Sequence, residues 1–423
     1  MQSYSLAYGK TRLDFSFPDF FQVQPVAPEF VPGAENPIVE VERALDQGLG
    51  GINLDRFQNA KTVGIAVNDK TRPVPLHLLL PPLVARLERM GIPSNNIRFY
   101  FATGTHAPMT PAEMRSLLPP ALVERHPVYS HDCDAATRMV DLGKTSYGTP
   151  VLCSESFLGN DLKIVTGNIE PHHFAGFSGG VKTFSIGLAG RETINRNHSL
   201  LLDPRSRTGE FENNPLRQDI EEIGRLAKID LALNAVLNEK KEIVRAFFGS
   251  PLDVIQAGIP IARQVCQTPV HGRYDLVIAS VGGHPKDINL YQAQKALTHA
   301  SMLTRDGGVV ILVGACPEGS GSQGLEDQMM AANSPADVVQ KFDRVNFRVG
   351  PHKAFQFARE LVRIRVILLS ELPAELVRRL FLIPASTPEE ALEAAFELLP
   401  AAPSVAILPR AINTIPLVEP FEG

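Results

Sequence analysis

The chain has 423 residues and a formal net charge of −5 at pH 7, with 44% hydrophobic and 21% charged residues. This composition is typical of a globular protein, and the length favours two domains over one. The slightly acidic balance argues against a nucleic-acid partner, which usually meets a basic patch. No apolar run approaches the roughly 18 residues that would indicate a membrane-spanning helix, so we expect no membrane partner either.

The N-terminal residues and the cysteines both bear on the cellular compartment. The first residues lack an apolar core followed by a small-residue cleavage site, so they do not resemble a secretory signal. The four cysteines are scattered and form no Cys-x-x-Cys pair, which argues against a zinc knuckle or a disulfide framework. We therefore expect a reduced, cytoplasmic protein. The oligomeric state is not predicted by any of these features.

Strand-like and helix-like segments alternate along the first 270 residues. Apolar, β-branched runs predict buried strands at 61–69, 96–106 and 161–167. The apolar spacing of 76–91 predicts a helix, and we expect Pro81 and Pro82 to interrupt it early. A further helix is expected to begin near Thr110, with Glu113 completing a capping box.

The same alternation restarts after a boundary that we place near residue 270. Strands are predicted at 273–283, 307–315 and 363–372, and helices at 291–304 and 388–400. We therefore predict an α/β fold with two α/β domains and mostly parallel sheets. The first domain would span 1–270 and bind the cofactor, and the second would span 271–403. We expect the terminal segment 404–423 to return to the first domain.

Polar, glycine-rich loops follow the predicted strands. In open parallel sheets, ligands bind beyond the carboxyl ends of the strands. The relevant loops are 68–75, 103–110, 167–180, 282–295 and 314–324. We expect them to converge on one crevice between the two domains, which would be the active site.

Two of these loops have the composition of an anion-binding turn. In FAGFSGGVK (174–182), glycines allow consecutive N–H groups to face an anion and Lys182 adds a positive charge, although the segment is no Walker loop. In TGTHAP (103–108), two threonines and a glycine offer hydroxyl and N–H donors beside His106. The alternatives are a tight structural turn with a surface lysine, and a histidine with a structural hydrogen bond.

Other polar residues of the loops have two interpretations each. Arg72 could clamp a carboxylate or phosphate, or form an internal ion pair with Asp69. The histidines of this region are His172, His173 and His198. Imidazole binds several transition metals, but no standard zinc spacing is present, so these histidines could equally be structural. In DINLYQAQK (287–295), the spacing of Gln292 and Lys295 predicts that they share one helix face. Two interpretations are open: the pair binds a substrate anion, or the face is simply exposed to solvent.

Together these segments resemble the family of lactate racemases that depend on a nickel-pincer nucleotide. The resemblance rests on the order and spacing of NDKTRPVP, TGTHAPMT, EPHHFAGFSGGVK, the NHS sixteen residues after its lysine, and DINLYQAQK. It covers nearly the whole chain. The sequence departs from the family at Ala107, where many relatives have a basic residue, and at Val181, where arginine or a small residue is usual.

The resemblance implies a cofactor and the residues that hold it. The cofactor is a nickel complex of pyridinium-3-thioamide-5-thiocarboxylic acid mononucleotide, which the family's enzymes for cofactor biosynthesis would supply. Lys182 matches the lysine that can be joined to it covalently, and His198 matches the nickel ligand. The remaining cofactor-binding residues are expected to be Asp69, Thr103, Gly104, Thr105, Ser178, Gly179 and Gly180.

The resemblance also implies an activity, the racemisation or epimerisation of a 2-hydroxy acid through a 2-keto acid. Hydride removal gives a planar carbon that accepts the hydride back on either face, and two histidines would exchange the hydroxyl proton. These are His106 and His172, with the adjacent His173 leaving the second assignment open. The substrate carboxylate is expected to meet Arg72, Tyr291, Gln292 and Lys295.

Two other classes of function are compatible with parts of the sequence. A hydrolase or lyase could hold a conventional metal with His106, His172 and His198, although no carboxylate stands in a recognisable metal motif. Alternatively, the chain could bind a nucleotide without catalysis. Neither alternative requires Lys182 together with all three histidines. Which 2-hydroxy acid would be the substrate is not predicted.

Overall fold

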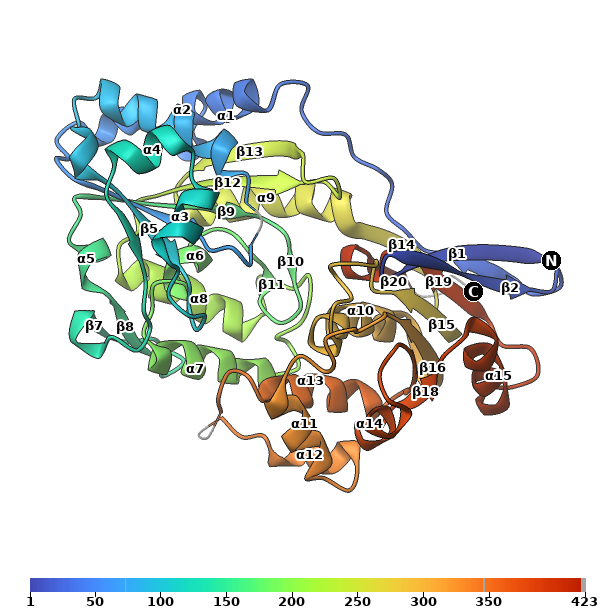
Figure 1. The fold of residues 1–423 in the computed structure, drawn as a ribbon. Helices are drawn as coiled ribbons and strands as arrows, with labels where there is room; N and C mark the ends of the chain where they lie inside the picture. The colour runs from blue at the N-terminus through green and yellow to red at the C-terminus, as the bar shows by residue number, and fades with distance from the viewer. Residues whose placement is uncertain (73, 345–346, 420–423) are drawn as a thin grey trace. The chain divides into compact units, whose positions relative to one another are not determined.

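The structure is a computed structural model that describes residues 1–72, 74–344 and 347–419. The chain divides into two compact units. One consists of Phe30–Val265, and the other combines Met1–Glu29 with Cys266–Gly423. Each unit has its own six-stranded sheet (Figure 1). The predicted α/β class is therefore confirmed.

The Phe30–Val265 unit is built on a sheet with the strand order β13-β12-β9-β4-β5-β6. Every neighbouring pair in it is parallel except β12 with β13. Its strands are β4 (Val63–Asn68), β5 (Ile97–Ala102), β6 (Val128–Ser130), β9 (Leu162–Asn168), β12 (Leu231–Leu237) and β13 (Ile243–Gly249). Two small antiparallel pairs accompany it, namely β7 (Met139–Lys144) with β8 (Pro150–Ser154) and β10 (Pro171–His172) with β11 (Gly176–Phe177).

Helices cover both faces of this sheet, with α1 and α2 on one face and α6 and α8 on the other (Figure 1). The helices of the unit are α1 (Pro37–Asp46), α2 (Leu76–Arg89), α3 (Pro111–Leu117), α4 (Pro120–Arg125), α5 (Glu155–Leu158), α6 (Lys182–Ser185), α7 (Arg191–Ser199), α8 (Pro215–Leu226) and α9 (Pro251–Cys266). Because both faces are covered, the central strands are mostly apolar, as in parallel sheets generally.

Two local predictions in this unit have different outcomes. The capping box at Thr110 and Glu113 is confirmed, since both reciprocal hydrogen bonds are present at the start of α3. The prediction that prolines interrupt the helix of residues 76–91 is wrong, because α2 continues through Pro81 and Pro82. Burial of its leucines against the sheet offsets the cost of two missing backbone donors.

The second unit has an all-parallel sheet with the order β18-β17-β16-β15-β19-β3. Its strands are β3 (Val23–Pro25), β15 (Tyr274–Ser280), β16 (Thr304–Val313), β17 (Arg365–Leu369), β18 (Ile383–Ala385) and β19 (Val405–Leu408). Its helices are α10 (Leu290–Leu303), α11 (Gln323–Met330), α12 (Pro335–Lys341), α13 (His352–Leu361), α14 (Ala374–Arg379) and α15 (Pro388–Leu398). Two further strand pairs are β1 (Gln2–Tyr8) with β2 (Thr11–Phe17) and β14 (Gln267–His271) with β20 (Ile415–Glu419).

Alternate residues of β15 belong to two separate hydrophobic clusters, one on each face of this sheet. Leu276 and Ile278 pack with the N-terminal hairpin and α15, whereas Val277 and Ala279 pack with α10 and α13. This alternation follows from the two-residue period of a strand. It explains why the strand is a continuous apolar run.

The predicted domain limits need two corrections at the chain termini. Residues 404–419, the described part of the terminal segment 404–423, do not return to the first domain, because β19 pairs with β15 and β3 and all four of its residues are buried. The last four residues lie outside the described part of the chain. The N-terminal residues also belong to the second unit, where Phe15 and Phe17 are fully buried in its core. The division falls between Val265 and Cys266, near the boundary that we placed at residue 270.

The helices within the described residues are all too short or too polar to cross a membrane.

Candidate active site

The loops that follow β4 and β5 lie next to each other, because these strands are parallel neighbours and Asn68 is paired with Ala102. Asp69 stands on the first loop and His106 on the second. The Oδ2 atom of Asp69 lies 2.6 Å from Nδ1 of His106. Asp69 also accepts hydrogen bonds from the N–H (3.2 Å) and the hydroxyl (2.7 Å) of Thr71. The structure thus pairs Asp69 with a histidine, an arrangement that our sequence interpretation did not include.

Electrostatics set the tautomer of His106. Burial acts to raise the pKa of Asp69, but hydrogen bonds from His106 and Thr71 outweigh it and hold the pKa below the usual value of 3.8. An ionised carboxylate is a pure acceptor, so Nδ1 of His106 must donate. The other ring nitrogen, Nε2, then carries the lone pair and can accept a proton. The His106 side chain is 53% exposed, so a substrate can approach the ring.

Replacing Asp69 by asparagine should lower turnover on the order of 10²-fold with little change in KM. An asparagine amide can donate to Nδ1, which would favour the tautomer with a protonated Nε2 and remove the base. The measurement is steady-state racemisation of the loaded enzyme. Thr71→Val, which removes one hydrogen bond to Asp69 and leaves His106 bonded, is the matched control and should lose much less. Equal effects of the two variants would contradict this role of Asp69.

The loop 103–106 uses several of its donors within the protein. The N–H of Gly104 donates to the carbonyl of Gly187 (3.0 Å), and the hydroxyl of Thr103 donates to the carbonyl of His131 (2.8 Å). Gly104 has a positive φ of 57°, which favours glycine there. The first of these bonds ties the loop that carries His106 to Gly187, in the segment that follows Lys182. Two of the donors that we expected to face an anion, the hydroxyl of Thr103 and the N–H of Gly104, are therefore engaged by the protein itself.

The glycine loop before Lys182 is also fixed by buried partners. The N–H of Gly180 donates to Oδ1 of Asn234 on β12 (2.6 Å), and the N–H of Ser178 donates to the carbonyl of Glu170 (2.7 Å). Gly179 and Gly180 have φ values of 91° and 57°. A side chain at 179 would also meet Ile169, at 2.6 Å from Cβ. The two glycines are thus required by conformation and by space.

Lys182 is the first residue of α6 and lies in a strongly cationic environment. Although its side chain is partly exposed, desolvation by the surrounding protein lowers its pKa well below 10.5. The positive charges of Arg72 and Arg217 act in the same direction, and Glu170 opposes them. A lysine with a lowered pKa has a larger fraction of neutral, nucleophilic amine at pH 7 than an ordinary surface lysine.

His198 lies near the end of α7 and is buried. Burial lowers its pKa to about 3, the charges of Lys182 and Arg72 act in the same direction, and the carbonyl of Ile194 opposes them. The imidazole is therefore neutral at pH 7, which is the form that binds metal ions. The preceding residue, Asn197, anchors the helix by donating to Oδ2 of Asp219 (2.8 Å) and to the carbonyl of Leu216 (3.1 Å).

Aromatic contacts connect His172 with His198. The rings of His172 and His173 are stacked, with centroids 4.6 Å apart and an interplanar angle of 15°. Phe174 makes edge contacts with His172 (4.5 Å) and with His198 (5.2 Å). The Nδ1 atom of His172 accepts a hydrogen bond from the N–H of Ala175 (3.2 Å). The structure thus brings His172, His173 and His198 into one group, and the choice between His172 and His173 as a base stays a prediction.

The predicted substrate residues of the second unit occupy the first turns of α10. The side chain of Asn289 caps this helix by accepting from the N–H of Gln292 (3.1 Å). Nζ of Lys295 donates to Oε1 of Gln292 (2.8 Å), so these two residues share one face as their spacing predicts. Nζ of Lys353 lies 4.8 Å from the centroid of the Tyr291 ring.

The chain is similar to known proteins over most of its length. Residues 8–209 match the family model of the lactate racemase N-terminal domain, and residues 271–415 match that of the lactate racemase C-terminal domain. The chain is 31% identical to the lactate racemase of Lactiplantibacillus plantarum over 89% of its length and 90% of that protein. It is 30% identical to the lactate racemase of Thermoanaerobacterium thermosaccharolyticum over 98% of its length and 99% of that protein. The chain belongs to the lactate racemase family.

Solved structures support the same conclusion. The lactate racemase apoprotein from Thermoanaerobacterium thermosaccharolyticum superimposes with a TM-score of 0.91 at 30% identity, covering 98% of this chain and all of that one. A Thermotoga maritima protein shares the fold, with a TM-score of 0.65 at 16% identity over 93% of this chain and 100% of that one. As a member of the lactate racemase family, the chain is an isomerase of the racemase type.

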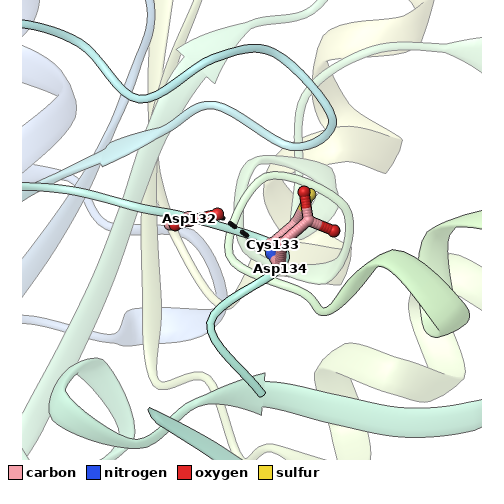
Figure 2. Close-up of side chains that lie close together, drawn as sticks. All are labelled: Asp132, Cys133 and Asp134. Carbon is pink, nitrogen blue, oxygen red and sulfur yellow. Dashed lines mark hydrogen bonds between the residues drawn. The ribbon is translucent and has the colours of Figure 1, made fainter. Parts of the chain in front are cut away.

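A cluster outside the family motifs also has the composition of a metal site. Asp132, Cys133 and Asp134 place their ligand atoms within 4.8 Å of one another, and Figure 2 shows the bond from the N–H of Asp134 to Asp132 (3.0 Å). Asp134 is already paired with Arg191 (2.7 Å), and burial raises the pKa of the Cys133 thiol. The carbonyl of Cys133 accepts from the N–H of Arg191 (3.0 Å), so this cluster anchors the start of α7, and we assign no metal to it.

Sequence reasoning missed several buried polar residues that support the site. Asn234 fixes the glycine loop, and Asp219 anchors the helix of His198. Arg217 donates a hydrogen bond to the carbonyl of Gly179, in the loop before Lys182. One signal for Arg217 was present, since Arg217 and Glu221 stand four residues apart on one face of an amphipathic helix. That spacing usually marks a surface ion pair, and so it did not indicate a buried one.

Proposed function

We propose that this chain interconverts the enantiomers of lactate, or of a related 2-hydroxy acid, with a nickel-pincer nucleotide as its cofactor. Membership of the lactate racemase family supports racemisation. The observation that supports the cofactor is the neutral, buried imidazole of His198 in the same charged environment as Lys182. A soft nickel complex suits a neutral imidazole ligand, and its phosphate suits the cations nearby.

Unsatisfied polar groups in the Phe30–Val265 unit fit such a ligand. Oγ of Ser178 and Nδ2 of Asn234 are buried, and neither has a hydrogen-bond partner among the described residues. Buried polar groups are seldom left unpaired, because each costs about 1–3 kcal/mol. Arg72, Lys182 and Arg217 add positive charge around an anion. Ser178 and Asn234 would hold the cofactor phosphate in this positive field, with Lys182 as the candidate covalent attachment and His198 as the nickel ligand. Arg217 contributes only its charge, because its Nη1 and Nη2 atoms donate hydrogen bonds within the protein.

The bound cofactor would supply a hydride acceptor, so that the 2-hydroxy acid passes through a planar 2-keto acid. The role of the protein is to move the hydroxyl proton and to hold the substrate. His106 is prepared for the first task, because Asp69 fixes its tautomer and would stabilise the imidazolium formed when Nε2 accepts the proton. His172 would perform the same task for the opposite enantiomer.

The substrate carboxylate needs cations and hydrogen-bond donors. Arg72 is on the same loop as Asp69 and is a candidate for paired hydrogen bonds to a carboxylate. Gln292 and Lys295 are further candidates, since their side chains already form one hydrogen-bonded group. We propose all three as substrate-binding residues, with Tyr291 beside them as the aromatic contact.

The test is co-expression with the enzymes that make the cofactor, followed by intact-protein mass, nickel content and racemisation of lactate. We expect a mass increase that maps to the Lys182 peptide, about one nickel per chain, and interconversion of D- and L-lactate. Protein made without those enzymes should fold but be inactive. A panel of larger 2-hydroxy acids, assayed in parallel, would define the substrate.

Each result bears on a different part of the proposal. Nickel without a covalent adduct would retain the cofactor and remove the attachment to Lys182. Activity on a larger 2-hydroxy acid and not on lactate would retain the chemistry and change the substrate. Folded protein with neither nickel nor activity, or activity in the absence of nickel, would overturn the proposal.

A further inference from the structure

Arg217 is a fully buried arginine that the proposed chemistry does not use directly. It lies on α8 and is the largest fully buried side chain among the described residues. Its Nη1 donates to the carbonyl of Phe177 (2.9 Å), and its Nη2 donates to the carbonyl of Gly179 (3.0 Å). Nη2 also pairs with Oε1 of Glu221, one turn further along the same helix. Arg217 therefore joins a buried ion pair to the backbone of the loop before Lys182.

An ion pair alone does not account for a charge at this place. Removing two charges from water usually costs more than their attraction returns, so apolar residues commonly replace such pairs without loss of stability. Apolar residues, however, would not supply the two N–H donors that bond to the carbonyls of Phe177 and Gly179. Arginine is suited to this task, because its planar fork holds several donors in fixed directions.

The fit between Arg217 and the loop is close. A Cβ atom at Gly180 would stand 3.0 Å from Nη2 of Arg217, and Gly180 has a positive φ of 57°. On its other side, the loop is held by Asn234, which accepts from the N–H of Gly180. Two buried side chains from different elements, α8 and β12, thus hold the two sides of the same peptide group, the one that joins Gly179 to Gly180. The next residues are Val181 and Lys182.

The packing of Val181 continues the same arrangement. A Cβ atom on Gly224 of α8 would stand 2.2 Å from Cγ2 of Val181, so the valine packs directly on a helix position without a side chain. Arg217, Glu221 and Gly224 succeed one another along one face of α8. That face supports the loop from Phe177 to Val181, and the absence of a side chain at Gly224 leaves the room that Val181 occupies.

We propose that Arg217, held by Glu221, is a positioning residue that sets the conformation of the loop 177–181 and thereby directs the Lys182 amine toward the cofactor. This inference rests on the proposed function, because it assumes that Lys182 serves the cofactor. Arg217 acts through the loop and touches neither the substrate nor the reacting atoms. Its task is to hold the loop in the same conformation before and after the cofactor binds.

The test compares Arg217→Lys with the double variant Arg217→Met, Glu221→Leu. Lysine keeps the charge opposite Glu221 but does not reproduce the fork of donors, whereas the double variant removes the ion pair without leaving an unpaired carboxylate. We expect both to fold. In the protein without cofactor, amide exchange of residues 177–181 should become roughly tenfold faster in both variants, with β4 unchanged. After loading, nickel per chain and kcat should fall in both, while KM for the 2-hydroxy acid stays the same.

The conservative variant decides between positioning and a purely structural role. If Arg217→Lys exchanges its loop amides and binds nickel like the wild type, the ion pair suffices and the proposal is overturned. If KM rises and kcat is unchanged, Arg217 acts on substrate binding, which also overturns it. If the wild type itself takes up no nickel, the proposed function fails. The role of Arg217 is still decided by amide exchange in the variants without cofactor: faster exchange of residues 177–181 shows that Arg217 holds the loop, and unchanged exchange shows that it does not.

Discussion

Replacing His106 by alanine should reduce racemisation about 10²- to 10⁴-fold while nickel content and the mass of the loaded protein stay unchanged. The physical reason is the lone pair that Asp69 maintains on Nε2 of His106, because alanine leaves the hydroxyl proton without an acceptor. The measurement is the initial rate with each pure enantiomer, using protein whose nickel content has been determined. His77→Ala, an exposed histidine on α2, is the matched control and should keep full activity.

The two directions of the reaction provide an internal check on this result. The enantiomers of lactate have equal free energies, so kcat/KM must be the same for both in the wild type and in every variant. The loss in His106→Ala must therefore appear equally in both values of kcat/KM, whichever histidine serves each enantiomer. Retention of a tenth or more of the wild-type rate would show that His106 is not an essential base.

Strands and motif loops could be predicted from the sequence because their signals are local. The apolar run that forms β4 is bounded by polar residues, and Asp69 and Arg72 follow it directly. Parallel neighbours then bring the ends of β4 and β5 together by the geometry of the sheet alone. The pairing of Asp69 with His106 joins residues 37 apart, and neither residue alone indicates it.

The course of the chain termini could not be predicted in this way. A short apolar strand such as β19 fits either sheet, and its own residues do not specify β15 and β3 as the neighbours. The N-terminal hairpin is fixed by side chains and turns from distant parts of the sequence. Asp287, for example, accepts from the N–H of Gly9 (2.7 Å) and of Ala315 (3.1 Å). Asp287 begins the motif segment DINLYQAQK (287–295), and the structure gives it a structural role.

The supporting residues of the site were missed for a related physical reason. Polar residues such as Asn234 and Arg217 are mostly exposed in proteins, so a sequence pattern assigns them to the surface. Their burial here depends on partners that the fold brings close, namely the N–H of Gly180 for Asn234 and the carbonyls of Phe177 and Gly179 for Arg217. The motif identifies the loop, and the buried residues that fix its conformation become visible only in three dimensions.

Replacing His198 by alanine should lower nickel affinity by at least about 10²-fold, because this side chain is the proposed protein ligand. Removing only a hydrogen-bond partner of a metal ligand typically weakens metal binding about 10- to 100-fold, so removing the ligand itself should cost at least as much. The buried, neutral imidazole has no other function in the proposed mechanism. The measurement is nickel per chain after prolonged dialysis of co-expressed protein, together with the mass of the Lys182 peptide. His77→Ala again serves as the matched control.

A second variant, Lys182→Ala, separates ligation of the metal from attachment of the cofactor. If His198 ligates the metal and Lys182 holds the organic part, His198→Ala should keep an adduct on Lys182 and lose nickel. Lys182→Ala should lose the adduct and retain some nickel that dialysis removes gradually. Full retention of nickel by folded His198→Ala protein would show that other residues hold the metal. The group around His198 would then have to be assigned to the substrate, and the two histidines stacked beside Phe174 would become the first candidates for the nickel site.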